Sequence, residues 1–261
     1  MKFLVVGDVV GKTGVERLEK ELPKIISENK IDFCIVNGEN SANGKGLRIK
    51  EYDRIKKSGA DVITMGNHIY YRKEMATEYI KYSDLLIPAN ITNLNGNHNV
   101  VIERNGKKIG VINLIGKVEM GDIIEKNITD PFKTVLEQLE EVKNNGADYI
   151  FLDFHAEATA EKIAMGHFLT GKVTCVFGTH THVQTADEKI LDNKTAYITD
   201  IGMTGPTDSV IGLRKEVALK RFVEGAYAKY ECSDNKACLN GIIVTTDDNT
   251  NNPIKIERIN M

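Results

Sequence analysis

Short apolar runs alternate with helical spacings over the first third of the chain. The apolar runs cover residues 2–7, 31–36 and 61–65, and the helical spacings cover residues 15–28, 50–57 and 73–81. Strands that alternate with helices are joined by right-handed crossovers and form a largely parallel sheet. This part of the chain therefore predicts an α/β fold.

The rest of the chain adds hairpins to the parallel pattern. Asn105-Gly106 separates two apolar runs and is a strong two-residue hairpin signal, and Asp192-Asn193-Lys194 indicates a second hairpin. Further strands are expected at residues 149–154, 173–177, 241–246 and 254–259, and further helices at 131–144 and 157–169. No linker rich in Gly, Ser or Pro and no repeat interrupts the pattern, so we expect a single domain over residues 1–261.

Charge and hydropathy exclude several classes of protein. The chain has 34 Lys+Arg and 37 Asp+Glu, a net charge of −3 that gives no general attraction for nucleic acid or anionic membranes. No apolar stretch approaches the roughly 18 residues that a membrane span needs, and the apolar run at the start is too short for a signal peptide. We therefore expect a cytoplasmic protein that binds no membrane, and the sequence leaves a homo-oligomer open.

Polar residues gather where the predicted strands end. Two carboxylates, two amides and four of the six histidines follow five strands: Asp8; Glu39 and Asn40; Asn67 and His68; His155; and His180 and His182. In open α/β sheets, ligands bind outside the carboxyl ends of the strands. One such residue alone is commonly a turn former or a helix cap, but five coincidences in register predict a shared functional site.

The donor types in this set favour a metal centre. Oxygen and imidazole donors without thiolates suit first-row divalent metals. Eight donors exceed one tetrahedral site and are enough for two metals about 3.5–4 Å apart that share a carboxylate. Such a pair lowers the pKa of water and neutralises charge on a phosphoryl group. A nucleotide-binding P-loop is disfavoured, because only three residues separate Gly7 from Gly11 where that motif needs four.

Several charged residues outside this set have two interpretations each. Four basic residues are candidates to bind a nucleotide phosphate, although such residues are more commonly solvated charges on the surface. They are Lys45, Arg48, Arg72 and Arg214. Asp153 shares a strand face with His155, so it either orients a metal ligand or is a plain buried carboxylate. Asp200, at another strand end, has the same two interpretations.

Two motifs resemble those of the calcineurin-type metallophosphoesterases. They are Gly66-Asn67-His68 and Gly178-Thr179-His180-Thr181-His182, and they are accompanied by Asp8 and His155; the likeness extends from residue 2 to about residue 212. Val10, Glu39 and Ile69 stand where the wider family has a His, a bridging Asp and an Asp or Glu. With these departures, the segments 7–11, 37–40 and 199–206 are similar to the YmdB-like bacterial metallophosphodiesterases.

The resemblance implies a four-layer α/β/β/α sandwich of two mixed sheets with two metal ions, iron or manganese, with zinc as an alternative. It implies that one metal is held by Asp8, Glu39, Asn40 and His182, and the other by Glu39, Asn67, His155 and His180, with Glu39 bridging. A metal-bridging hydroxide would attack phosphorus, and His68 would protonate the leaving oxygen as the general acid. The implied reaction hydrolyses small cyclic phosphodiesters, 2′,3′-cyclic nucleotides, to 3′-nucleotides.

Other functions use the same donors. A phosphomonoesterase or an RNA-directed nuclease would need the same metals, although the net charge of −3 argues against a long basic groove for RNA. A metal-dependent nucleotide sensor without catalysis is a further alternative, because Val10 and Ile69 replace groups common in the wider family.

Overall fold

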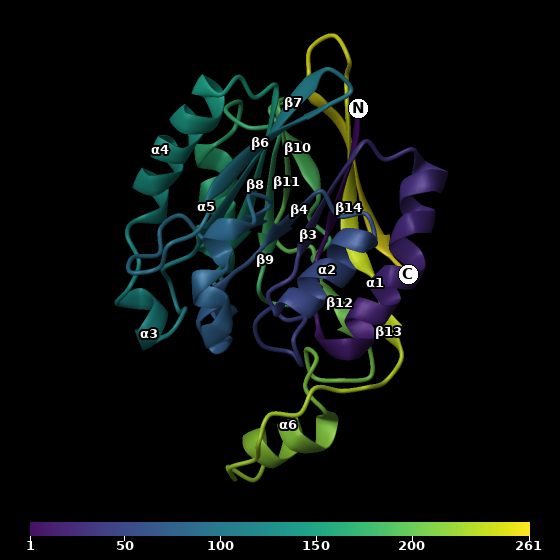
Figure 1. Cartoon of the computed structure of the whole chain (residues 1–261), viewed down its shortest axis with the longest axis vertical. Coiled ribbons are helices and arrows are strands. Elements are labelled where there is room, and N and C mark those ends of the chain that lie inside the picture. The colour runs from purple at the N-terminus through teal and green to yellow at the C-terminus, as the bar shows by residue number, and fades with distance from the viewer.

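Two six-stranded sheets lie face to face in the computed structural model of the chain (Figure 1). The structure describes the backbone of residues 1–261 and every side chain except those of Asp122 and Ile123. In spatial order, the first sheet consists of β15 (Pro253–Asn260), β14 (Asn240–Thr246), β1 (Lys2–Val6), β3 (Phe33–Asn37), β4 (Val62–Thr64) and β5 (Leu85–Leu86). The second consists of β10 (Lys189–Leu191), β11 (Thr195–Ile198), β9 (Cys175–Thr179), β8 (Tyr149–His155), β7 (Lys107–Ile115) and β6 (Asn99–Arg104). A small third sheet consists of β13 (Ala237–Cys238), β12 (Met203–Pro206) and β2 (Asp8–Val9).

Both large sheets are mixed, as predicted. Strands β1, β3, β4 and β5 pair in parallel, β14 pairs antiparallel with β1, and β15 pairs antiparallel with β14. Strands β7, β8, β9 and β11 are also parallel, and the two predicted hairpins add β6 and β10 at the edges. The first hairpin turns at Asn105 and Gly106, whose φ angles of 51° and 72° are those of a type I′ turn.

Helices cover the outer face of each sheet, so the layers run α/β/β/α. The α-helices are α1 (Gly11–Asn29), α2 (Ile49–Lys57), α3 (Asp122–Glu125), α4 (Pro131–Asn144), α5 (Thr159–Phe168) and α6 (Lys215–Phe222). Figure 1 shows α1 and α2 on one side of the sandwich and α4 and α5 on the other. None of the helices that the structure describes has the long apolar stretch needed to cross a membrane.

Alternating side chains on the central strands separate the core into layers. On β1, Phe3 and Val5 point between the two sheets, whereas Leu4 and Val6 pack under the helices of the first sheet. The Phe3 ring lies 4.7 Å from the ring of Phe151 on β8, centroid to centroid. This period of two is the expected signature of strands buried on both faces.

Two helical predictions differ from the structure. Helix α1 begins at Gly11 rather than at residue 15, because the missing side chain of Gly14 lets the first turn pack directly on the backbone of β12. The helix expected at 73–81 is wrong: this segment forms the short 3-10 helices η2 (Lys73–Thr77) and η3 (Tyr79–Lys81), which follow η1 (Asn67–Tyr71). Its Met75 and Tyr79 are buried as the spacing indicated, but its backbone bonds span three residues instead of four.

Residues 207–236, which we call the arm, connect β12 to β13. The arm carries α6 and extends beyond the sheets at the bottom of Figure 1. Its two ends lie side by side, since Leu213 forms a bridge with Cys232. Several apolar side chains of the arm are exposed, including Phe222 with 81% of its surface accessible.

Candidate metal centre

The eight predicted donors come together: seven end or follow strands of the two large sheets, and Asp8 lies in the small third sheet directly after β1. Asp8 lies on β2, and Glu39 and Asn40 lie in the turn after β3. Asn67 and His68 begin η1 directly after β4, His155 ends β8, and His180 and His182 follow β9. The carboxyl ends of parallel strands meet at one edge of a sheet, so face-to-face packing of two such sheets brings all five segments together.

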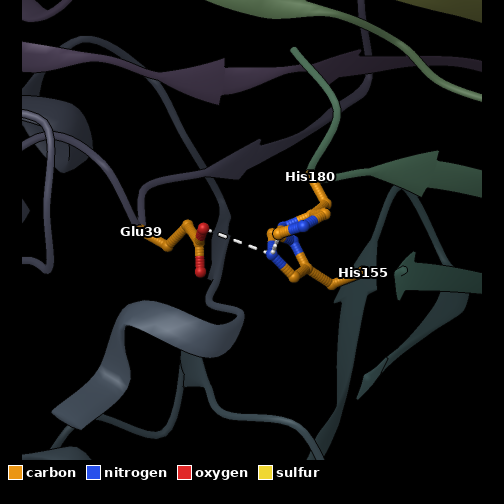
Figure 2. A group of neighbouring side chains, drawn as sticks. All are labelled: Glu39, His155 and His180. Carbon is orange, nitrogen blue, oxygen red and sulfur yellow. Dashed lines mark hydrogen bonds and ion pairs between the residues drawn. The ribbon is translucent and has the colours of Figure 1, made fainter. Parts of the chain in front are cut away.

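One ring nitrogen of His155 is surrounded by more partners than it can bond. His155 Nε2 lies 2.9 Å from Asn67 Oδ1 and 3.0 Å from His180 Nδ1. The same nitrogen lies 3.2 Å from Glu39 Oε1, and Figure 2 shows the two imidazoles and the carboxylate converging from three separate segments. A ring nitrogen carries one hydrogen or one lone pair. A cation among these atoms would satisfy all of them, and the donor set therefore fits a metal ion.

A second group of donors adjoins the first. His182 Nε2 lies 3.1 Å from Asn40 Nδ2 and 3.8 Å from Asp8 Oδ1. Asn40 Nδ2 also lies 3.1 Å from Glu39 Oε1, which joins this group to the one around His155. The donors thus form two groups that both include a contact with Glu39.

His68 is oriented by the turn after β3. Its Nδ1 lies 2.6 Å from Asn40 Oδ1 and 3.3 Å from Glu39 Oε1, and its backbone N–H donates to Glu39 Oε2 at 3.2 Å. The Asn40 amide consequently turns its nitrogen toward the acids and its oxygen toward His68. Metal ligation by the Asn40 oxygen would need a half-turn of this amide, which would present Nδ2–H to His68 Nδ1 instead.

The turn that carries His180 and His182 has an energetically unfavourable backbone conformation. Both residues have positive φ, 96° and 66°, a conformation that costs a non-glycine residue about 1–3 kcal/mol. Thr181 between them anchors the turn, because its backbone N–H and its hydroxyl both donate to Asp200, at 3.2 and 2.7 Å. Asp200 is in turn paired with the buried Lys162 at 2.7 Å. Asp200 therefore supports the histidine turn rather than lining the site.

Asp153 supports His155 through a hydroxyl. Thr179 Oγ1 donates to Asp153 at 2.7 Å and lies 2.9 Å from His155 Nδ1. Asn37 and Thr64 also donate to the Asp153 carboxylate. These contacts fix the imidazole so that Nε2 faces the other donors, as a second layer of polar groups does around metal-binding histidines. Of the two interpretations of Asp153, the orienting one agrees with these contacts.

Burial and mutual proximity shift the pKa values of the donors in opposite directions. Burial and the nearby His155 lower the pKa of His180 to about 2, which keeps this imidazole neutral and able to ligate a metal. Burial opposes a charge on His155, but the Glu39 carboxylate outweighs it and raises the His155 pKa to about 9. Burial raises the pKa of Asp8 well above its usual range. The Glu39 carboxylate thus favours a positive charge on His155, whereas His180 stays neutral.

A cavity of about 400 Å³ opens onto the donors. Glu39, Asn40, His68, His180 and His182 line one part of it. Another part is lined by the arm, which contributes the side chains Ile211, Arg221, Phe222 and Tyr230 among others. This volume is within the range of small-molecule sites, about 300–1,000 Å³.

The sequence did not single out every residue of this cavity. Glu157 Oε2 lies 3.0 Å from His180 Nε2 and lines the cavity, two positions after His155. Arg221, Phe222 and Tyr230 of the arm were not predicted either, because a loop that returns over the site carries no periodicity that predicts its position.

Comparison with known proteins decides the family. A family model described as YmdB-like protein matches residues 4–259. The chain belongs to the YmdB-like family. The resemblance inferred from its motifs is thereby confirmed, as is the metallophosphoesterase-type sandwich.

Individual relatives of this family align over nearly the whole chain. A Bacillus subtilis (strain 168) protein named 2′,3′-cyclic-nucleotide 2′-phosphodiesterase is 42% identical over 260 residues, which cover 99% of this chain and 96% of the relative. The crystal structure of a novel phosphatase of Mycoplasma pneumoniae has a TM-score of 0.92 and 39% identity, covering 100% of this chain and 93% of that one. A hypothetical protein from Thermus thermophilus has a TM-score of 0.91 and 32% identity, with coverage of 100% and 99%.

Proposed function

We propose that this chain is a metal-dependent phosphodiesterase that hydrolyses 2′,3′-cyclic nucleotides to 3′-nucleotides. The observation that carries the proposal is the crowding of oxygen and nitrogen donors around His155 Nε2, with a second group of donors adjoining through Glu39. The name of the Bacillus subtilis relative supports the choice of a cyclic nucleotide as substrate.

Two ions belong to the proposal. Asp8, Asn40 and His182 would hold one, Asn67, His155 and His180 the other, and Glu39 would bridge them. Iron or manganese suits these oxygen and imidazole donors, with zinc as the alternative. When bound, two divalent ions supply charge that stabilises the phosphoryl oxygens and lowers the pKa of water.

His68 is the proton donor in this proposal. The contacts described for its ring use Nδ1, toward Asn40 and Glu39. Nε2 is therefore the nitrogen that would protonate the leaving 2′ oxygen, as a general acid does. His68 lines the cavity next to the metal donors, where a leaving group would emerge.

The cavity favours a small substrate over a polymer. Its volume of about 400 Å³ accommodates a mononucleotide, and the arm closes one side with apolar and aromatic groups suited to a nucleobase. A single metallophosphoesterase domain over residues 1–261 and a cytoplasmic location are parts of the same proposal.

Turnover of two substrates tests the proposal. The protein loaded with manganese or iron is incubated with 2′,3′-cyclic AMP and with bis(p-nitrophenyl) phosphate, and the adenosine product is identified by chromatography. We expect 3′-AMP, two metal ions per chain by elemental analysis, and no turnover after chelation. Tight binding of 2′,3′-cyclic AMP without product would favour a sensor, and a fully loaded protein with one ion per chain would contradict the dinuclear centre.

A further inference from the structure

The four basic residues that the sequence singled out have different surroundings in the structure. Arg48 pairs with Glu51 at 2.8 Å, and Arg72 donates to the Ala42 carbonyl oxygen. Arg214 pairs with Glu231 at 2.9 Å. Lys45 lines the cavity of the metal donors, and none of the carboxylates that the structure describes lies within ion-pair distance of it.

Two aromatic rings hold Lys45 in place instead. Its Nζ lies 4.6 Å from the centroid of the Tyr71 ring and 5.0 Å from that of the Tyr230 ring. Nζ also donates to the Tyr71 hydroxyl at 3.2 Å. Cation–π contacts stabilise an ammonium without neutralising its charge. Lys45 is thus a half-buried cation whose charge remains uncompensated.

The backbone around Lys45 is shaped to admit this arrangement. Gly44 has a φ of 81°, and a Cβ atom there would lie 2.4 Å from the Tyr230 hydroxyl oxygen. Only glycine leaves room for the Tyr230 ring to lie against the loop. The arm, which carries Tyr230, therefore contacts the loop after Glu39 and Asn40 at the position of Gly44 and Lys45.

Tyr71 also links Lys45 to the proposed proton donor. The Tyr71 ring packs edge-on against the His68 imidazole with a centroid distance of 5.0 Å. A single phenol ring therefore contacts both the imidazole of His68 and the ammonium of Lys45. The cavity has a positively charged side chain directly beside the place where a leaving group would be protonated.

We propose that Lys45 is a substrate-binding residue whose ammonium binds an anionic oxygen of the phosphodiester. The nature of the substrate rests on the function proposed above; the binding of a phosphate oxygen by Lys45 does not. An ammonium that lacks a carboxylate partner and lines a cavity is suited to a charge-assisted hydrogen bond with a phosphate oxygen. Tyr71 and Tyr230 are the groups that position it.

The test replaces Lys45 by methionine, which keeps the length of the side chain and removes its charge. The matched control is Lys172→Met, because Lys172 Nζ also lies over an aromatic ring, that of Phe168 at 4.4 Å, but does not line this cavity. We expect Lys45→Met to raise KM for 2′,3′-cyclic AMP about 10–100-fold, the range of a hydrogen bond to a charged group. Because the contact forms in the bound substrate as well as in the transition state, kcat should change little.

Two further measurements separate charge from fold. Lys45→Arg keeps the positive charge and the stacking on aromatic rings, and should restore KM to near the unmodified value. Calorimetry should show weaker binding of inorganic phosphate to metal-loaded Lys45→Met by a similar factor, with an unchanged metal content. Rising salt should weaken phosphate binding by the unmodified protein more than by the variant.

The outcomes distinguish this proposal from the function proposed above. If the unmodified protein turns over neither diester but Lys45→Met alone weakens phosphate binding, the role of Lys45 holds and the proposed reaction fails. If turnover is observed and Lys45→Met matches Lys172→Met in KM and phosphate affinity, the role of Lys45 is refuted. A Lys45→Arg variant as weak as Lys45→Met would also refute it.

Discussion

Replacement of Lys162 by methionine would measure how much the buried Lys162–Asp200 ion pair, which supports the turn carrying His180 and His182, contributes to stability. Lys162 and Asp200 each expose 1% of their side chains, and their charged atoms are 2.7 Å apart. Removal of one partner of a buried pair costs about 3–5 kcal/mol, because the other charge stays buried. Asp200 would keep three donors, from Thr181 twice and from the Gly202 N–H at 2.8 Å. We therefore expect the lower end of that range, a loss of about 3 kcal/mol.

Thermal and urea unfolding of the metal-free protein would measure this loss without a contribution from bound ions. For a chain of 261 residues, each 1 kcal/mol corresponds to about 2–4 °C, so Tm should fall by about 6–12 °C. The double variant Lys162→Met/Asp200→Asn, in which neither position of the pair carries a charge, should recover much of the loss. The reasoning is refuted if the single variant loses less than about 1 kcal/mol or if the double variant is no more stable than the single one.

Three further predictions concern the metal centre and the cavity. His68→Ala should lower kcat about 10²–10⁴-fold and leave the metal content unchanged. The control is His167→Ala, which replaces an exposed histidine on α5 and should change neither quantity. Loss of metal from His68→Ala would contradict a role of His68 in proton transfer. Glu39→Gln should lower the affinity for both metal ions together in a titration followed by elemental analysis. Full retention of one ion would argue against a shared carboxylate. If the Phe222 ring stacks on the base, Phe222→Ala should raise KM for 2′,3′-cyclic AMP about tenfold. The control is Tyr227→Ala, because the Tyr227 side chain is exposed and does not line the cavity, and it should leave KM unchanged. Equal effects of the two variants on KM would exclude the stacking.

The sequence predicted most strands and helices of this fold because they follow from local patterns, whereas the four layers were implied by the family resemblance. The continuous apolar run from Phe3 to Val6 favours a strand buried on both faces, whatever the strands beside it are. The donors of the first sheet were predictable for a related reason: the parallel neighbours β1 and β3 place their carboxyl ends together, so Asp8 and Glu39 approach one another. His155 belongs to the second sheet and joins them only through the face-to-face packing of the two sheets.

Other features depend on contacts between distant segments, which leave no local pattern. The segment at 73–81 has a helical spacing of apolar residues, yet the Tyr79 hydroxyl donates to the Ile69 carbonyl oxygen at 3.0 Å, and the backbone winds more tightly than an α-helix. Likewise, nothing near Lys45 in the sequence distinguished it from the three arginines. Only the return of the arm, which brings Tyr230 against Gly44, does so.

The pairing of β1 with β14 has a consequence for how the protein is made. Strand β1 leaves the ribosome long before its antiparallel partner β14, residues 240–246, and the Gly7 N–H beside Asp8 donates to the Asn240 carbonyl oxygen at 2.9 Å. During synthesis one edge of β1 therefore stays unpaired until residues 240–246 have emerged, and unpaired edges promote association between nascent chains. A truncation before residue 240 would leave that edge permanently open, so fragments that retain all the metal donors should still aggregate.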